Sequence, residues 1–168
     1  MTKKQLAVVL LCVMLLVCGR LCLCPMLTVA FDYANQEDFA SGYASFELCN
    51  KYIDGKYFYY TAWCSSQLDN KPMYMMWVYK GNQVIAGDAT TGHIQDGSDI
   101  TVYRVKSQTV EQYVVFGHNP DKKYSSYTLD LLDNNQVAKE YVVDIADKEH
   151  ILDVYDCDKI YIPRLTFE

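Results

Sequence analysis

Residues 125–132 read SSYTLDLL, and their polar and apolar side chains alternate along most of the segment. Three apolar side chains share one face of such an extended chain: Tyr127, Leu129 and Leu131. Thr128 and Asp130 fall on the opposite face. A period of two is typical of a β-strand that buries one face, so this stretch predicts a half-buried strand.

A second alternating segment follows at residues 136–145. We expect four of its side chains to share the buried face: Val137, Tyr141, Val143 and Ile145. Residues 133–135, Asp-Asn-Asn, lie between the two segments and are residue types that favour tight turns. The two strands are therefore predicted to pair as a hairpin.

Two further segments are apolar on both faces, residues 57–64 (YFYYTAWC) and residues 73–79 (MYMMWVY). The second is followed by Gly81 and Asn82, which accept the positive φ angles of a two-residue hairpin turn. A strand of this kind either lies at the centre of a fold, covered on each side, or presents one face to a partner.

Four more segments read as strands: Ile100–Val105, Thr109–Gly117, Ile151–Tyr155 and Ile160–Phe167. Pro163 belongs at an edge or bend, because proline has no backbone donor. Between Tyr33 and Asn50 the aromatic residues recur three to four positions apart, which predicts one short amphipathic helix. We therefore expect an all-β antiparallel β-sandwich of immunoglobulin-like architecture, with a β-barrel as the alternative.

The first thirty residues resemble an export signal peptide in their layout. Lys3 and Lys4 precede an uncharged, mainly apolar run from Leu6 to Gly19. Cleavage before Phe31 would leave residues 31–168 as a single β-rich domain outside the cytoplasm, either secreted or at the cell surface.

Two alternatives retain the N-terminal segment. A membrane anchor would place Arg20 in the bilayer and Pro25 inside a helix, and both are unfavourable. A lipid anchor needs a small residue before the acylated cysteine, whereas Val or Leu precedes each candidate: Cys18, Cys22 and Cys24. Membrane contact is therefore expected only through this segment, if it is retained.

The charge balance argues against nucleic-acid binding. Removal of Lys3, Lys4 and Arg20 lowers the number of Lys and Arg residues from 15 to 12, against 21 Asp and Glu, and the formal net charge from −6 to −9. Such a surface repels phosphate backbones, so no nucleic-acid partner is expected.

Three of the seven cysteines follow residue 30: Cys49, Cys64 and Cys157. They predict either one disulfide of undetermined pairing with a spare thiol, or three small buried side chains. The histidines, His93, His118 and His150, lack metal-ligand spacing and are expected in surface loops. A cysteine nucleophile paired with His118 or His150 is the only catalytic alternative, so we expect neither an enzyme nor a cofactor.

Two aspartate clusters are candidates to bind a calcium ion, which takes about six to eight oxygen ligands. They are Asp96 with Asp99, and Asp153 with Asp156 and Asp158. Neither matches the calcium-loop pattern, so no metal site is expected.

The dense aromatic and methionine residues of segments 57–64 and 73–79 supply the functional hypothesis. We expect the faces that carry Trp63 and Trp77 to be core. The opposite faces then form a possible binding surface: Phe58, Tyr60, Tyr74 and Met76. Aromatic and methionine side chains are enriched at protein interfaces. The sequence therefore favours a non-catalytic interaction or structural domain with an extracellular or envelope protein partner, and a carbohydrate-binding module with exposed Tyr or Trp is the alternative.

Overall fold

The structure is a computed structural model that describes residues 25–65, 67–68, 72–90, 99–106 and 111–168. Its strands are β1 (Ser45–Asp54), β2 (Tyr57–Ser65), β3 (Pro72–Lys80), β4 (Gln83–Thr90), β5 (Asp99–Lys106), β6 (Glu111–His118), β7 (Ser126–Asp133), β8 (Gln136–Asp144), β9 (His150–Cys157) and β10 (Ile162–Phe167). Residues 25–41 are helical, and a short 3-10 turn, Pro120–Lys122, precedes β7.

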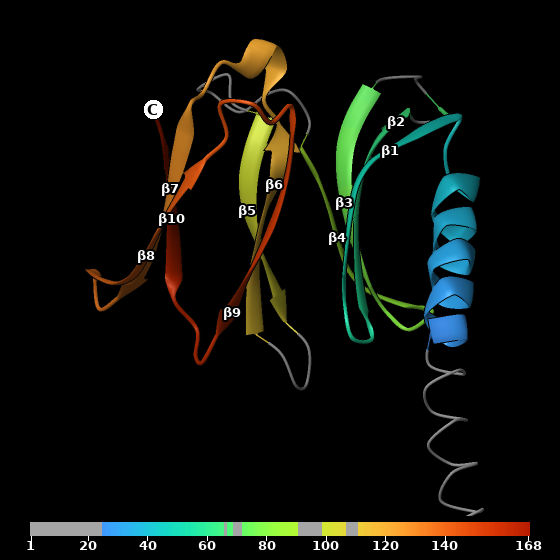
Figure 1. Ribbon diagram of the computed structural model, residues 1–168, viewed down its shortest axis with the longest axis horizontal. Helices are drawn as coiled ribbons and strands as arrows, with labels where there is room; N and C mark the ends of the chain where they lie inside the picture. The colour runs from blue at the N-terminus through green and yellow to red at the C-terminus, as the bar shows by residue number, and fades with distance from the viewer. Residues whose placement is uncertain (1–24, 66, 69–71, 91–98, 107–110) are drawn as a thin grey trace, which may run out of the picture.

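The strands form three antiparallel sheets that stack as layers (Figure 1). The first sheet has the order β1-β2-β3-β4, the middle sheet β5-β6-β9, and the outer sheet β10-β7-β8. The expected all-β antiparallel sandwich is confirmed, and none of the three sheets closes into a barrel. The middle sheet lies between the other two, so it has a packed core on each of its faces.

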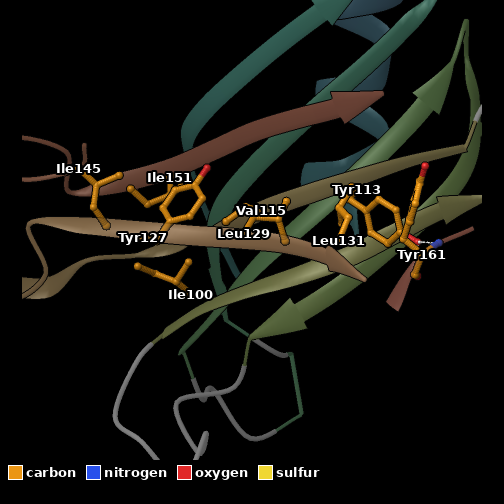
Figure 2. Packing of buried hydrophobic residues seen from close by; sticks show 9 residues of the cluster. All are labelled: Ile100, Tyr113, Val115, Tyr127, Leu129, Leu131, Ile145, Ile151 and Tyr161. Carbon is orange, nitrogen blue, oxygen red and sulfur yellow. Dashed lines mark hydrogen bonds between the residues drawn. The ribbon is translucent and has the colours of Figure 1, made fainter. Parts of the chain in front are cut away.

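The core between the outer and middle sheets confirms the alternation of residues 125–132. Tyr127, Leu129 and Leu131 of β7 are fully buried there, against Tyr113 and Val115 of β6. Figure 2 shows this cluster as a continuous row between the strands. The predicted hairpin is also confirmed, because β7 pairs with β8 through a turn in which Asn134 and Asn135 both have positive φ angles.

A second core fills the space between the middle and first sheets. Its buried residues come from four strands: Tyr57, Tyr59, Tyr74, Met76, Val78, Val105, Val114 and Phe116. Val114 and Phe116 point into this second core from one face of β6, whereas Tyr113 and Val115 lie on the other face of the strand. Strand β6 is therefore buried on both faces, as its apolar sequence requires.

The helix covers the remaining face of the first sheet and creates a third core. Its Phe39 packs on a cluster that includes Phe58, Tyr60 and Tyr79. Two helix carboxylates hold the sheet tyrosines, since Tyr60 donates to Asp32 at 2.9 Å and Tyr79 donates to Asp38 at 3.0 Å. Strands β2 and β3 are thus central strands covered on each side, which is the first of the two interpretations of their apolar sequence.

The helix and β1 differ from the expectation for residues 33–50. The helix ends at residue 41, and β1 begins at Ser45, so Phe46 lies on a strand. A bulge between Leu48 and Asn50 moves the later side chains to the opposite face, which hides the alternation of β1 in the sequence. No helix of the described residues is long and apolar enough to cross a membrane.

Two details of the outer sheet also bear on the prediction. Val137 was expected in the core, but a bulge between Leu131 and Leu132 shifts the register, and Val137 pairs with Leu132 with 48% of its surface exposed. Pro163 is confirmed at a sheet edge, because β10 is an edge strand.

Candidate functional site

The four residues expected to form a binding surface are all inside the molecule. Phe58 and Tyr60 lie beneath the helix, whereas Tyr74 and Met76 lie between the first and middle sheets. Each is at most 1% exposed. This corrects the expectation of an exposed face, for the physical reason that the helix covers one side of the sheet and the middle sheet covers the other.

The tryptophan faces are packed, as expected, although both indoles are only half-buried. Trp77 lies under the helix, with its ring centroid 3.6 Å from that of Phe39. Trp63 lies on the other face of the sheet, 5.2 Å from the ring of Tyr74 and 5.2 Å from that of His118.

His118 and His150 lie on strands, which corrects their expected place in loops. They are direct partners in the pairing of β6 with β9, and their rings stack at 5.3 Å. His118 also lies 3.4 Å from the carboxylate of Glu149, whereas Nδ1 of His150 is buried without a hydrogen-bond partner in the described part of the chain. His93 falls outside the described residues.

All three cysteines of the described chain are free, which favours the interpretation of them as small packed side chains. Burial raises the pKa of the Cys64 thiol to about 11, so at neutral pH it is an unreactive thiol. Cys64 packs beneath the helix, on the opposite face of the first sheet from the two histidines. Cys157 pairs with Glu111 at the far end of β9 from His150. Cys64 and Cys157 therefore do not meet His118 or His150, whereas Cys49 packs against the core that contains Tyr74, whose ring stacks on both histidines.

The aspartates of the candidate calcium cluster at residues 153–158 point in different directions. Asp153 accepts a hydrogen bond from Tyr127 on the outer-sheet side, whereas Asp156 accepts one from Gln112 on the other side of the middle sheet. Asp158 binds Lys139 at 2.6 Å, and this contact lowers the pKa of its carboxyl to about 2. No group of metal ligands is found among the described residues, and the side chains of Asp96 and Asp99 lie outside them.

The outer face of the outer sheet is the clearest open surface, since no described element packs on it (Figure 1). Its strand register produces three rows of side chains across the sheet. The aliphatic row is Ile162, Leu132 and Val137; the charged row is Arg164, Asp130 and Glu140; the third row is Thr166, Thr128 and Val142. We call this set of nine residues the outer face.

One end of the outer face is an aliphatic row, and the other end has one exposed valine beside two threonines. Ile162 is 60% exposed and Val142 is 67% exposed, and the neighbouring Ile160 adds a further exposed aliphatic side chain. Contiguous exposed aliphatic surface of this kind marks a contact site more often than scattered apolar residues do.

An ion pair holds two side chains of the charged row in place at the centre of the outer face. Arg164 donates through Nε at 3.0 Å and Nη2 at 2.5 Å to the same carboxylate oxygen of Asp130, whose residue is 6% exposed. Glu140 is exposed and forms no ion pair with another described residue. The outer face therefore carries one uncompensated negative charge between its aliphatic row and Val142.

Comparisons with known proteins add no constraint to this geometry. No family model matches the sequence, and neither the curated proteins nor the solved structures contain a match.

Proposed function

We propose that this chain is an exported, non-catalytic domain, secreted or held at the cell surface, that binds a protein partner through the outer face. The observation that carries the proposal is the exposed aliphatic row of Ile162, Leu132 and Val137 on one side of the charged row, with the exposed Val142 on the other side. The face contains no aromatic residue, which favours a protein partner over a sugar there, because sugar sites need flat rings for stacking.

The three rows of the outer face indicate which side chains a partner surface would need. An aliphatic or aromatic side chain of the partner would cover Ile162 and Val137, and a lysine or arginine would meet the free carboxylate of Glu140. Residues 31–168 have a formal charge of −9, so a basic partner surface would also be attracted over longer distances.

The packing of the helix supports export with removal of the segment before Phe31. Met26 and Val29 are 68% and 69% exposed. The ring of Phe31 lies 6.4 Å from that of Phe58, and the two helix carboxylates that accept hydrogen bonds from sheet tyrosines, Asp32 and Asp38, follow it in the sequence. Cleavage before Phe31 would remove these exposed apolar side chains and would keep the contacts of Phe31, Asp32, Asp38 and Phe39 with the first sheet.

Site-specific photo-crosslinking in intact cells of the producing organism tests the proposal. A benzophenone amino acid is placed at Ile162 or at Val142, and in a matched control at Val84, an exposed aliphatic residue of the first sheet. We expect one protein adduct of the same mass from both outer-face positions and none from Val84. The same pattern at all three positions, or no adduct from the outer face, would contradict the proposal.

A further inference from the structure

The edges of the first and middle sheets leave an open groove between them. Strand β1 is an edge of the first sheet and β9 is an edge of the middle sheet, so the two lie along the same side of the sandwich. The groove has a volume of about 340 Å³. Its polar and aromatic lining is Asn50, Lys51 and Tyr52 from β1, with Lys148, His150 and Asp153 from β9 and the residues before it.

Tyr52 gives the groove a fixed aromatic wall. The side chain is 46% exposed, and its ring is supported from behind by Tyr59 at a centroid distance of 5.7 Å. Tyr59 is fully buried and donates its hydroxyl proton to Gln112, which in turn donates to Asp156 at 2.7 Å. A ring held in this way presents an apolar face without a large loss of side-chain entropy on binding.

The remaining lining offers both donors and acceptors. The amide of Asn50 has no side-chain hydrogen-bond partner among the described residues, and it supplies one acceptor and two donors. Lys148 lies 3.7 Å from Asp153 Oδ1, so a ligand hydroxyl can bind both groups. The other carboxylate oxygen, Oδ2, already accepts a hydrogen bond from Tyr127 on the outer-sheet side, so Oδ1 is the oxygen that Asp153 offers to the groove.

The charges of the groove cancel. Lys51 forms a 2.7 Å ion pair with Asp32, and Lys148 faces Asp153, so each cation has its own carboxylate. A phosphate or carboxylate ligand would meet Asp153 and two lysines whose charges are already paired, and a cationic ligand would meet the two lysines. A neutral ligand rich in hydroxyl groups avoids repulsion from both the aspartate and the lysines.

We infer that this groove binds a neutral sugar, with Tyr52 stacked on one face of the ring and Asn50, Lys148 and Asp153 hydrogen-bonded to its hydroxyls. Hydroxyl groups donate and accept at once, which matches the paired donors and acceptors of the lining. The volume lies at the small end of the range for ligand sites, about 300 to 1,000 Å³, so it suits one or two rings of a glycan. This site would supply the carbohydrate-binding function that the sequence leaves as its alternative.

The experiment is an NMR titration of the isotope-labelled chain with glucose, galactose, mannose and N-acetylglucosamine, each as the free sugar and as a short oligosaccharide. We expect at least one of these probes to shift the amide signals of residues 50, 52 and 150 in a saturable manner. Tyr52→Ala should weaken that binding about tenfold or more, whereas Tyr52→Phe, which keeps the ring, should change it by less than about threefold.

Two controls separate the groove from other surfaces. Tyr33→Ala removes a tyrosine of the helix that is 65% exposed, more than the 46% of Tyr52, and should leave sugar binding unchanged. Asn50→Ala should weaken binding without shifting the unfolding midpoint, because its amide holds no other described side chain. The inference is overturned if none of the probes shifts the groove signals at tens of millimolar, or if Tyr52→Ala binds as tightly as the parent.

The proposals for the groove and for the outer face can be refuted independently of each other. Tyr52→Ala should leave the crosslinked adduct from Ile162 intact, because the two residues lie on different sheets. If the chain binds sugar but yields no crosslinked adduct, the sugar-binding inference stands and the protein-binding proposal is refuted. If the adduct forms but no sugar binds, the protein-binding proposal stands and the sugar-binding inference is refuted.

Discussion

The imidazole rings of His118 and His150 stack at 5.3 Å on neighbouring strands, beside Trp63 and Tyr74. Burial lowers the pKa of His150 below its ordinary value of 6.5; Glu149 opposes this shift, and His118 adds to it. The folded chain therefore binds this proton less readily than the unfolded chain does. Stability should be highest above pH 6.5 and should fall as the pH drops below 6.5, until folded His150 is itself protonated.

Urea unfolding at several pH values between about 7.5 and 5 would measure this loss. His150→Gln should flatten the pH dependence in this range, because glutamine does not titrate. An equally steep loss in that variant would show that another group is responsible.

Removal of the Phe39 ring should open the core beneath the helix. The side chain is 3% exposed and touches the rings of Trp77 and Phe46. Phe39→Ala should lower the free energy of unfolding by about 3 to 5 kcal/mol. Tyr33→Ala, on the exposed side of the same helix, should change it by less than about 0.5 kcal/mol. Equal effects of the two substitutions would mean that the helix is not docked as described.

Tryptophan emission should report two packed but unequal sites. Trp77 is enclosed by Phe39 and Tyr43, and Trp63 by Tyr74 and His118. Native emission should therefore be blue-shifted from that of the unfolded chain. Replacement of either residue by alanine should cost about 3 kcal/mol, the low end for a large aromatic, because both rings keep some exposure. A native spectrum at the solvent-exposed wavelength would count against both placements.

The N-terminus of exported material should lie at or close to Phe31. Edman sequencing or intact mass measurement of chain recovered from outside the cytoplasm of its natural host would check this. Recovery of intact Met1 in a membrane fraction would instead support a retained anchor.

Calcium should leave the unfolding temperature unchanged. The carboxylates of Asp153 and Asp156 point to opposite faces of the middle sheet and already accept hydrogen bonds from Tyr127 and Gln112. A cation bound at a hundred times its dissociation constant would add about 2.7 kcal/mol. Thermal curves with chelator and with millimolar calcium should therefore superimpose, and a shift of several degrees upward would refute this expectation.

The sequence predicts most strands because side-chain alternation depends only on local geometry. It predicts the β7–β8 hairpin well, since Asn134 and Asn135 can both adopt positive φ angles. It misses β1, because one bulged residue between Leu48 and Asn50 reverses the alternation there. It also places Val137 on the wrong face, for the same reason in β8.

The candidate sites could not be read from the sequence, because each depends on how separate elements meet. Phe58 and Tyr74 have the character of binding residues, and only the helix and the middle sheet decide that they are buried. The aliphatic row of the outer face exists only in the register that joins Ile162 to Leu132. The groove needs two sheet edges in line, which brings Tyr52 and His150 together from distant parts of the chain.

The position of β9 has a consequence for how the chain reaches its native state. This strand completes the middle sheet beside β6, although the β7–β8 hairpin of the outer sheet precedes it in the sequence. Neither inter-sheet core can close before residues 150–157 are available, and the pairing that closes them joins distant segments. Such non-local pairing slows folding. We therefore expect the two cores to reach their native packing only after β9, the ninth of the ten strands that the structure describes, has been synthesised.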